Sequence, residues 1–399
     1  MLFDPKLDAR LAQRPITARM CVLIYLDHAA TTPMRPGVWE AMAPHAVDSF
    51  GNSSGIHGVS RRAKNALEEA RERIADILGC GPMEVVFTSG GTESDNLALT
   101  GAVFNGSDRS DVVVAATEHE AVLETADFLR RRGSGVHVAG VDSDGRVETS
   151  AIVASLTPST SVVSLMLVNN ETGAVNDIVA VSHAVKEADP GVLVHTDAVQ
   201  AFGSMKFDVG QLGVDMLSLT AHKFGGPKGT GLLFVREGTP LEPLIHGGGQ
   251  ELGRRSGTHD VAGAVGLATA MELAAADRDR FVGEIGRIRD RFGEHLTRAF
   301  PEAVVNTPGS DRSPHHFNIR FPGVRNEALL IRLDKEGIAA SAGSACQSGA
   351  ATVSHVLEAM GLSAAEARES VRFSFGWTST TAEADRAAQT VIDLVGELR

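Results

Sequence analysis

A lysine and an aspartate each follow a short apolar run, and together they could hold an aldehyde cofactor. Lys223 comes after the run 214–219, and Asp197 comes after the run 191–194. A lysine amine forms a Schiff base with the aldehyde of pyridoxal 5′-phosphate (PLP), and a carboxylate pairs with the protonated ring nitrogen, which makes the ring an electron sink. Most lysines after strands are simply solvated, so the neighbouring motifs must decide.

A glycine turn upstream could bind the phosphate of such a cofactor. The segment 89–92 contains Gly91 and Thr92 and leads from a predicted strand into a predicted helix. Free backbone N–H groups and the partial positive charge of a helix N-terminus favour a phosphate there. Thr220 and His222 flank the lysine and could donate to the same phosphate. The alternative is an ordinary glycine turn with an N-cap.

Three further polar side chains follow predicted strands. His119 could stack on an aromatic ring and move protons near neutral pH, or it could be an exposed residue at a helix start. Asn170 could contact a cofactor oxygen or a substrate carboxylate, although tandem asparagines also suit a turn. Gln200 lies three residues after Asp197 and could reach the phenolic oxygen of the ring.

Cys346 lies in a run of small residues, 341–352, where nothing in the run can bury it. Free cysteine usually packs in a core, so this setting favours a mobile loop that presents a thiol. A thiolate is a strong nucleophile, and nearby positive charge lowers its pKa. Cys21 and Cys80 have apolar or helix-end settings and are interpreted as structural. No cysteine–histidine spacing indicates a metal site.

Arg372 interrupts the apolar run 371–375 and therefore needs a partner. A substrate α-carboxylate bound through two hydrogen bonds is one candidate, and a structural salt bridge is the other.

Apolar periodicity predicts alternating strands and helices, hence an α/β fold with a mostly parallel sheet covered on both faces. The predicted strands are 84–88, 111–116, 162–168, 192–195, 216–219 and 232–235, and the helices are 57–78, one from 120, 179–186 and 261–300. Beyond residue 300, strands at 317–321 and 371–375 with helices at 327–336 and 382–398 predict a smaller α+β domain. Ligands of such sheets bind at the carboxyl ends of the strands.

Composition bounds the function. The chain has 399 residues with a formal net charge of −13, which disfavours direct binding of nucleic acid. No apolar run is long enough to cross a membrane. Three cysteines cannot form a disulfide framework, so a cytoplasmic location is expected. Residues 1–19 show no periodicity and are interpreted as a leader or an added extension, disordered and without a role in the fold.

These motifs together resemble the NifS/IscS-like cysteine desulfurases, which are PLP enzymes of fold type I (the aspartate-aminotransferase fold) in the class-V aminotransferase family. The resemblance covers nearly everything after residue 20 and rests on YLDHAATTP at 25–33, FTSGGTESDN at 87–96, HTDAVQ at 195–200, HKFGGPKG at 222–229, GGGQE at 247–251, RSGT at 255–258 and GSAC at 343–346. It implies a large PLP-binding domain at 35–280. It also implies a small domain formed by 20–34 with 281–399, which carries the cysteine loop.

The resemblance also implies a role for each residue. Cys346, Lys223 and His119 would be catalytic, with Cys346 as the nucleophile. PLP would be bound by Lys223, Asp197, Gln200, His119, Gly91, Thr92, Thr220, His222 and Asn170, and by Thr258, which would reach the phosphate of a partner subunit in a homodimer. The substrate carboxylate would be held by Asn52, Asn170 and Arg372.

The implied reaction converts L-cysteine to L-alanine and leaves a persulfide on Cys346, which passes to an acceptor protein. Detailed resemblance favours the branch that supplies sulfur for DNA phosphorothioation (the DndA desulfurases), with iron–sulfur cluster assembly and tRNA thiolation as competitors. A selenocysteine lyase, an aminotransferase and a non-enzymatic sulfur-transfer scaffold are further alternatives, although an aminotransferase needs no thiol. Two departures from the family concern loop geometry: Ser53 replaces the usual proline after Asn52, and Gln347 replaces a common threonine after Cys346.

Overall fold

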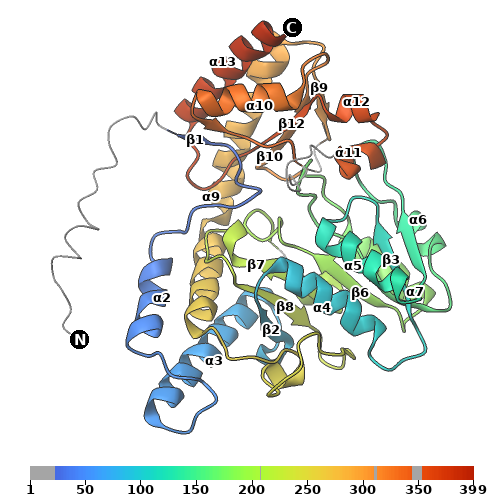
Figure 1. Cartoon of the computed structure of the whole chain (residues 1–399), viewed down its shortest axis with the longest axis vertical. Coiled ribbons are helices and arrows are strands. Elements are labelled where there is room, and N and C mark those ends of the chain that lie inside the picture. Colours follow the sequence, from blue (N-terminus) through green and yellow to red (C-terminus); the bar gives the residue numbers. More distant parts are fainter. Residues whose placement is uncertain (1–22, 207, 310–311, 344–352) are drawn as a thin grey trace.

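The computed structural model describes residues 23–206, 208–309, 312–343 and 353–399, so the predicted leader 1–19, Cys21 and Cys346 lie outside the described residues. Its centre is a seven-stranded sheet in the order β2-β8-β7-β6-β5-β3-β4 (Figure 1). The strands are β2 (Val85–Thr88), β3 (Asp111–Ala115), β4 (Val136–Ala139), β5 (Thr160–Ser164), β6 (Leu193–Asp197), β7 (Met216–Thr220) and β8 (Gly231–Val235). Neighbours pair in parallel except β8, which runs antiparallel to both β2 and β7. The predicted mostly parallel α/β sheet is confirmed.

Helices cover both faces of the sheet because successive strand residues point to opposite sides. In β3, Val113 packs in a core with helices α3 (Gly58–Leu78), α7 (Ile178–Ala188) and the first half of α9 (Val261–Ala299). Its neighbours Val112 and Val114 pack in a second core with α4 (Gly91–Val103) and α5 (Glu120–Arg131). Shorter helices on this part of the chain are α2 (Val38–Val47), α6 (Thr149–Ala154) and α8 (Val209–Leu212).

The C-terminal part builds a separate apolar core. A three-stranded antiparallel sheet, β9 (Val304–Asn306), β10 (His316–Arg320) and β12 (Ser370–Ser374), packs with α10 (Asn326–Lys335) and α13 (Thr381–Leu398) (Figure 1). The N-terminal strand β1 (Ile24–Tyr25) joins this part through parallel pairing with β11 (Ile338–Ala339). Helices α11 (His355–Ala359) and α12 (Ala364–Ala367) lie between α10 and β12 in sequence.

Helix α9 contributes to both parts. Residues from Ala264 to Ala274 pack in the core of the seven-stranded sheet, whereas Phe281 to Leu296 pack in the C-terminal core. We propose that the domain boundary lies where the helix passes from one core to the other, close to residue 280. In the described part of the chain, no helix is both long and apolar enough to cross a membrane.

Local sequence signals predicted the bounds of helix α3 correctly, but they did not predict where strand β5 ends. Helix α3 begins after His57, whose side chain accepts the Ser60 N–H, and it ends at Gly79 with φ +70°, a conformation that glycine adopts without steric cost. The predicted strand 162–168 was placed too far along the chain, because β5 ends at Ser164. Its apolar continuation 165–168 is buried, so hydrophobicity alone could not mark the end of the strand.

Candidate active site

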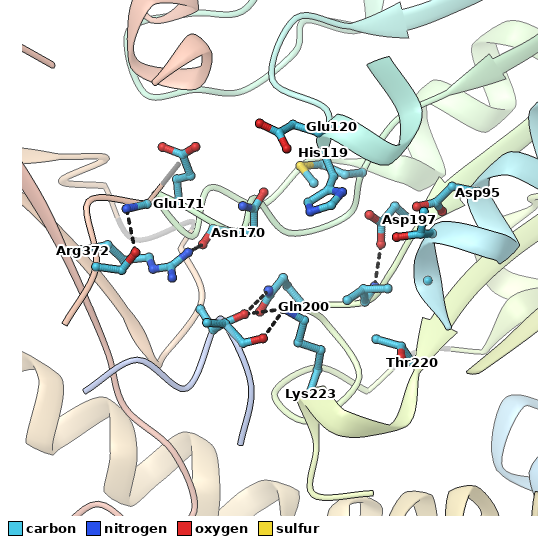
Figure 2. A pocket seen from close by; sticks show the side chains of 18 of the residues that line it. Asp95, His119, Glu120, Asn170, Glu171, Asp197, Gln200, Thr220, Lys223 and Arg372 are labelled. Atoms are coloured by element: carbon cyan, nitrogen blue, oxygen red, sulfur yellow. Dashed lines mark hydrogen bonds between the residues drawn. The ribbon is translucent and has the colours of Figure 1, made fainter. Parts of the chain in front are cut away.

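A cavity of about 510 Å³ lies at the carboxyl ends of the parallel strands, next to the C-terminal part. It is lined by Asp27, Ala29, Ala30, Gly91, Thr92, Asp95, His119, Glu120, Met166, Asn170, Glu171, Asp197, Val199, Gln200, Thr220, His222, Lys223, Ser341, Gly343, His355 and Arg372. Figure 2 shows Arg372 and Asn170 toward one end, Asp197 toward the other, and Lys223 between them. Ten of the thirteen predicted site residues, Arg372 among them, therefore line one cavity.

Lys223 extends from the short 3-10 helix that directly follows β7. Its Nζ donates hydrogen bonds to the carbonyl oxygens of Ala29 (2.6 Å) and Ala30 (2.9 Å). Burial, followed by the positive charge of Arg372, lowers the pKa of Lys223 to about 8. A lysine with a lowered pKa has a larger fraction of neutral, nucleophilic amine near neutral pH than an ordinary lysine has.

Asp197 is the last residue of β6 and is buried at the end of the cavity opposite Arg372 (Figure 2). Its Oδ1 accepts the Val199 N–H at 2.8 Å. Burial raises the pKa of Asp197, while His119 and Lys223 act in the opposite direction. Asp95 lies beside it (Figure 2), and burial followed by the charge of Asp197 raises the pKa of Asp95. A cationic ring nitrogen at this position would offset the cost of burying the Asp197 charge.

His119 is the N-cap of α5, and its Nδ1 accepts the Ala121 N–H at 3.0 Å. Because Nδ1 is an acceptor, the proton of the neutral ring lies on Nε2. Burial lowers the pKa of His119, although the Asp197 charge acts to raise it. His119 thus stands at a helix start, but it is half-buried rather than exposed, and it lines the cavity.

Gly91, Thr92, Thr220 and His222 line both this cavity and an adjoining, more open one of about 450 Å³. The adjoining cavity also contacts Ser89 and Lys228. Gly91 is the first residue of α4, which has 13 residues, so backbone N–H groups and the helix dipole favour an anion at this edge.

Arg372 is buried and makes the structural salt bridge that was the alternative to a substrate contact. Its Nη2 donates to Asp27 Oδ1 (2.7 Å) and its Nη1 to the Asn170 carbonyl oxygen (2.8 Å). Within the described residues, Arg372 Nε and Asn170 Oδ1 are buried without a hydrogen-bond partner. Both residues line the cavity, so a bound ligand can satisfy these atoms.

Gln200 lines the cavity, and its Nε2 donates to the Ala29 carbonyl oxygen at 2.9 Å. The same carbonyl accepts from Lys223, so the segment after β1 holds both side chains. The structure does not bring Asn52 or Thr258 to the cavity of the same chain. Both are exposed, and Asn52 Oδ1 accepts the Ser54 N–H at 2.9 Å.

Several further residues complete the cavity and were not predicted from the sequence. Asp27 fixes Arg372, and Asp95 lies beside Asp197. Glu171 is buried, accepts a hydrogen bond from Ser354 Oγ (2.6 Å), and burial raises its pKa. One signal was available for Glu171, since it directly follows Asn170 in the same post-strand segment.

The residues present fit PLP. The cavity combines an amine, a buried carboxylate at the end opposite Arg372, an anion-binding edge at α4, and the unpartnered Nε–H donor of Arg372. These groups match an aldehyde, a ring nitrogen, a phosphate and a substrate carboxylate, respectively.

Comparison with known proteins agrees with this geometry. Residues 24–387 match the family described as aminotransferase class-V. Cysteine desulfurase IscS of Dictyoglomus turgidum is 41% identical over 377 residues, which cover 94% of this chain and 95% of that protein. A solved NifS-like protein has a TM-score of 0.88 at 34% identity, covering 94% of this chain and 100% of its own. The solved structure of DndA from Streptomyces lividans has a TM-score of 0.74 at 35% identity. The match covers 88% of this chain and 99% of the DndA chain.

The family, the names of these relatives and the fit of the cavity to PLP lead to one assignment. The chain belongs to the class-V aminotransferase family of PLP-dependent enzymes and, within it, to the cysteine desulfurases.

Proposed function

We propose that this chain converts L-cysteine to L-alanine and leaves a persulfide on Cys346 for transfer to an acceptor protein. The observation that carries the proposal is the meeting of Lys223, Asp197 and Arg372, all three buried or half-buried, in one cavity. PLP, when bound, supplies the electron sink that lets a proton leave the substrate Cα. The residues proposed to hold it are Lys223, Asp197, Gln200, His119, Asn170, Gly91, Thr92, Thr220 and His222, with Thr258 from a partner subunit.

The substrate carboxylate is proposed to bind at Arg372 Nε and the side-chain amide of Asn170. The salt bridge to Asp27 fixes the orientation of the Arg372 guanidinium, and with it the direction of the unpartnered Nε–H. Lys223 is then placed to take a proton from the substrate Cα and to return it, because its pKa of about 8 suits transfer near neutral pH. His119 presents Nε2–H and is proposed to stack on the ring and pass protons.

Sulfur transfer balances without an external oxidant. The Cys346 thiolate forms an S–S bond with the substrate sulfur as the Cβ–S bond breaks. The bonding electron pair stays with the three-carbon fragment, which takes up protons to become alanine. Cys346 lies outside the described residues, so its role rests on the sequence.

The test measures alanine from L-cysteine with purified, PLP-loaded protein, beside Cys346→Ser and Cys80→Ser. The proposal requires alanine and a mass gain of one sulfur atom on Cys346 in the native protein. Cys80→Ser should behave as the native protein does, because burial raises the pKa of the Cys80 thiol to about 12. No alanine from native protein with intact cofactor absorbance, or full activity in Cys346→Ser, would refute the proposal.

The similarity to DndA of Streptomyces lividans supports DNA phosphorothioation as the pathway that receives the sulfur. Relatives named IscS are similar over more of the chain, so iron–sulfur cluster assembly is the direct competitor. Complementing a host that lacks its own phosphorothioation desulfurase, and separately one that lacks its iron–sulfur desulfurase, distinguishes the two. Restored phosphorothioate linkages in the first host alone would support the proposed pathway, and rescue of the second alone would exclude it.

A further inference from the structure

Asn52 and Thr258 are exposed and lie in segments 206 residues apart, yet the residues that follow them, Ser53 and His259, are bonded to each other. Ser53 is buried, and its Oγ lies 2.8 Å from His259 Nδ1. The residue after Asn52 therefore holds the residue after Thr258. The two side chains expected to contact substrate and phosphate project from one connected unit, although neither lines the cavity of its own chain.

This unit is anchored in the sheet by a buried ion pair. His259 Nε2 lies 2.8 Å from Glu251 Oε1, and Glu251 accepts two hydrogen bonds from Arg71, each at 2.8 Å. Arg71 Nη1 also donates to the Val85 carbonyl oxygen in β2, at 2.6 Å. Glu251 has a left-handed backbone with φ +48°, which is uncommon for a residue with a side chain, and these bonds hold it there.

One arrangement of protons satisfies the whole chain of contacts. Burial acts to raise the pKa of Glu251, but the hydrogen bonds from Arg71 and His259 outweigh it and lower that pKa to about 2. The ionised carboxylate can only accept, so His259 Nε2 carries the proton that it donates. In the neutral ring, Nδ1 then accepts from the Ser53 hydroxyl.

We propose that Ser53 and His259 are positioning residues, and that they hold Asn52 and Thr258 together so that both reach the active site of the partner subunit. The inference rests on the proposed desulfurase homodimer. It extends that proposal by assigning Asn52 to the same partner cavity as Thr258, because a joined unit cannot serve two distant sites. The hydrogen bond also explains how the loop is restrained where Ser53 replaces the proline usual in the family.

The surroundings of the unit favour a second copy of this chain as the covering surface. The side chains of Phe50, Ile56 and Leu252 flank it with 71%, 91% and 61% of their surface exposed. Large apolar side chains grouped in this way mark association surfaces. On the other side, Arg255 Nε donates to Glu93 Oε1 at 2.8 Å, and Glu93 Oε2 accepts the Ser89 N–H of the phosphate turn. The unit therefore borders the chain's own phosphate turn as well.

The experiment compares Ser53→Ala with Ser53→Thr, which keeps the hydroxyl, in the PLP-loaded full-length protein. Ser53→Ala should raise the KM for L-cysteine about three- to tenfold with kcat within about twofold, the signature of lost ground-state binding. Ser53→Thr should stay near the native KM. Amide hydrogen exchange should accelerate in residues 50–57 of Ser53→Ala, without a change in the sheet.

His259→Gln completes the cycle, because its amide can still donate to Glu251 while the acceptor for Ser53 is lost. The double variant Ser53→Ala with His259→Gln should raise KM no further than either single variant, since both break one bond. Additive effects would overturn the proposal, as would a native KM and native exchange in Ser53→Ala, or an equal loss in Ser53→Thr.

The proposed function and this inference fail differently. If the native protein forms no alanine, the desulfurase proposal fails, and hydrogen exchange still decides whether the Ser53–His259 unit exists. If the native protein is active and Ser53→Ala matches it in KM and in exchange, only the inference fails.

Discussion

The cavity and the Ser53–His259 unit place their functional residues in opposite ways. In the cavity, side chains from several strand ends face inward, and their own hydrogen bonds fix them: Lys223 to the Ala29 and Ala30 carbonyl oxygens, and Arg372 to Asp27. In the unit, the fixed residues are the neighbours, and Asn52 and Thr258 project outward. One chain thus assembles most of a site, and presents on its surface Asn52 and Thr258, which are proposed to complete the site of a partner subunit.

The two regions also differ in how their buried charged groups are stabilised. Burial lowers the pKa of Lys223 and His119 and raises that of Asp197, Asp95 and Glu171, so the cavity carries a cost that a cofactor and substrate can offset. In the unit, Glu251 is held ionised by Arg71. Within the described part of the chain, the cavity therefore has charged groups that lack ion-pair partners without ligands, whereas the Glu251 carboxylate that anchors the Ser53–His259 unit already has its partners.

The largest effect is expected at Lys223. Lys223→Met keeps the length of the side chain and removes the amine, so alanine formation should fall by roughly 10³-fold or more. The absorbance of the lysine-bound cofactor should disappear as well. Lys335→Met, on an exposed residue at the end of α10, is the matched control. Activity within tenfold of native in Lys223→Met would break the description of the cavity as the reaction site.

Arg372→Lys should have the next largest effect. A lysine cannot reproduce the planar fork that bonds Asp27 and the Asn170 carbonyl oxygen while presenting Nε to a ligand. We expect the KM for L-cysteine to rise by about 10- to 100-fold, as for the loss of charged hydrogen bonds. Steady-state kinetics beside Arg320→Lys, on the neighbouring strand β10, measure this. Equal effects in both variants would mean that Arg372 is structural.

Glu251→Gln tests the ion pair that anchors the Ser53–His259 unit in the sheet. At pH 7 it should lower the free energy of unfolding by about 2–3 kcal/mol, because Arg71 loses its ionised partner. The folded pKa of about 2 lies below the unfolded value of about 4.3. The native advantage is therefore complete above the unfolded pKa and is lost as the pH falls from about 4 toward 2. Denaturation at several pH values, with exposed Glu72→Gln as control, measures the difference, and a pH-independent difference would contradict this origin.

Asp95→Asn should give the smallest effect, in the opposite direction. Because burial and Asp197 raise the pKa of Asp95, its folded form binds a proton more tightly than the unfolded form does. Stability is then lost as the pH rises above the unfolded pKa, near 3.9. Without cofactor, Asp95→Asn should be more stable than native protein at pH 7 by roughly 1 kcal/mol. A loss of stability at pH 7 would show that the ionised carboxylate is well accommodated.

The sequence revealed the cavity better than it revealed the contacts within it. Lys223, Asp197 and His119 were found because each lies at the end of a strand or within four residues after it, which is a local pattern. The Asp27–Arg372 bridge joins residues 345 positions apart, and no local pattern encodes it. The burial of Asp95 also could not be predicted, because an aspartate in the first turns of a helix ordinarily faces solvent. The Ser53–His259 bond similarly joins two loops that only the tertiary fold brings together.

The measurement that tests the central comparison most directly is complementation between two inactive variants. One subunit carries Lys223→Met with native loops, and the other carries Asn52→Ala with Thr258→Val and a native cavity. If the loops serve the partner, each mixed dimer has one complete site, and random pairing at equal amounts should restore about a quarter of native alanine formation. A mixture no more active than the separate variants would show that each chain uses its own loops, and would contradict the account.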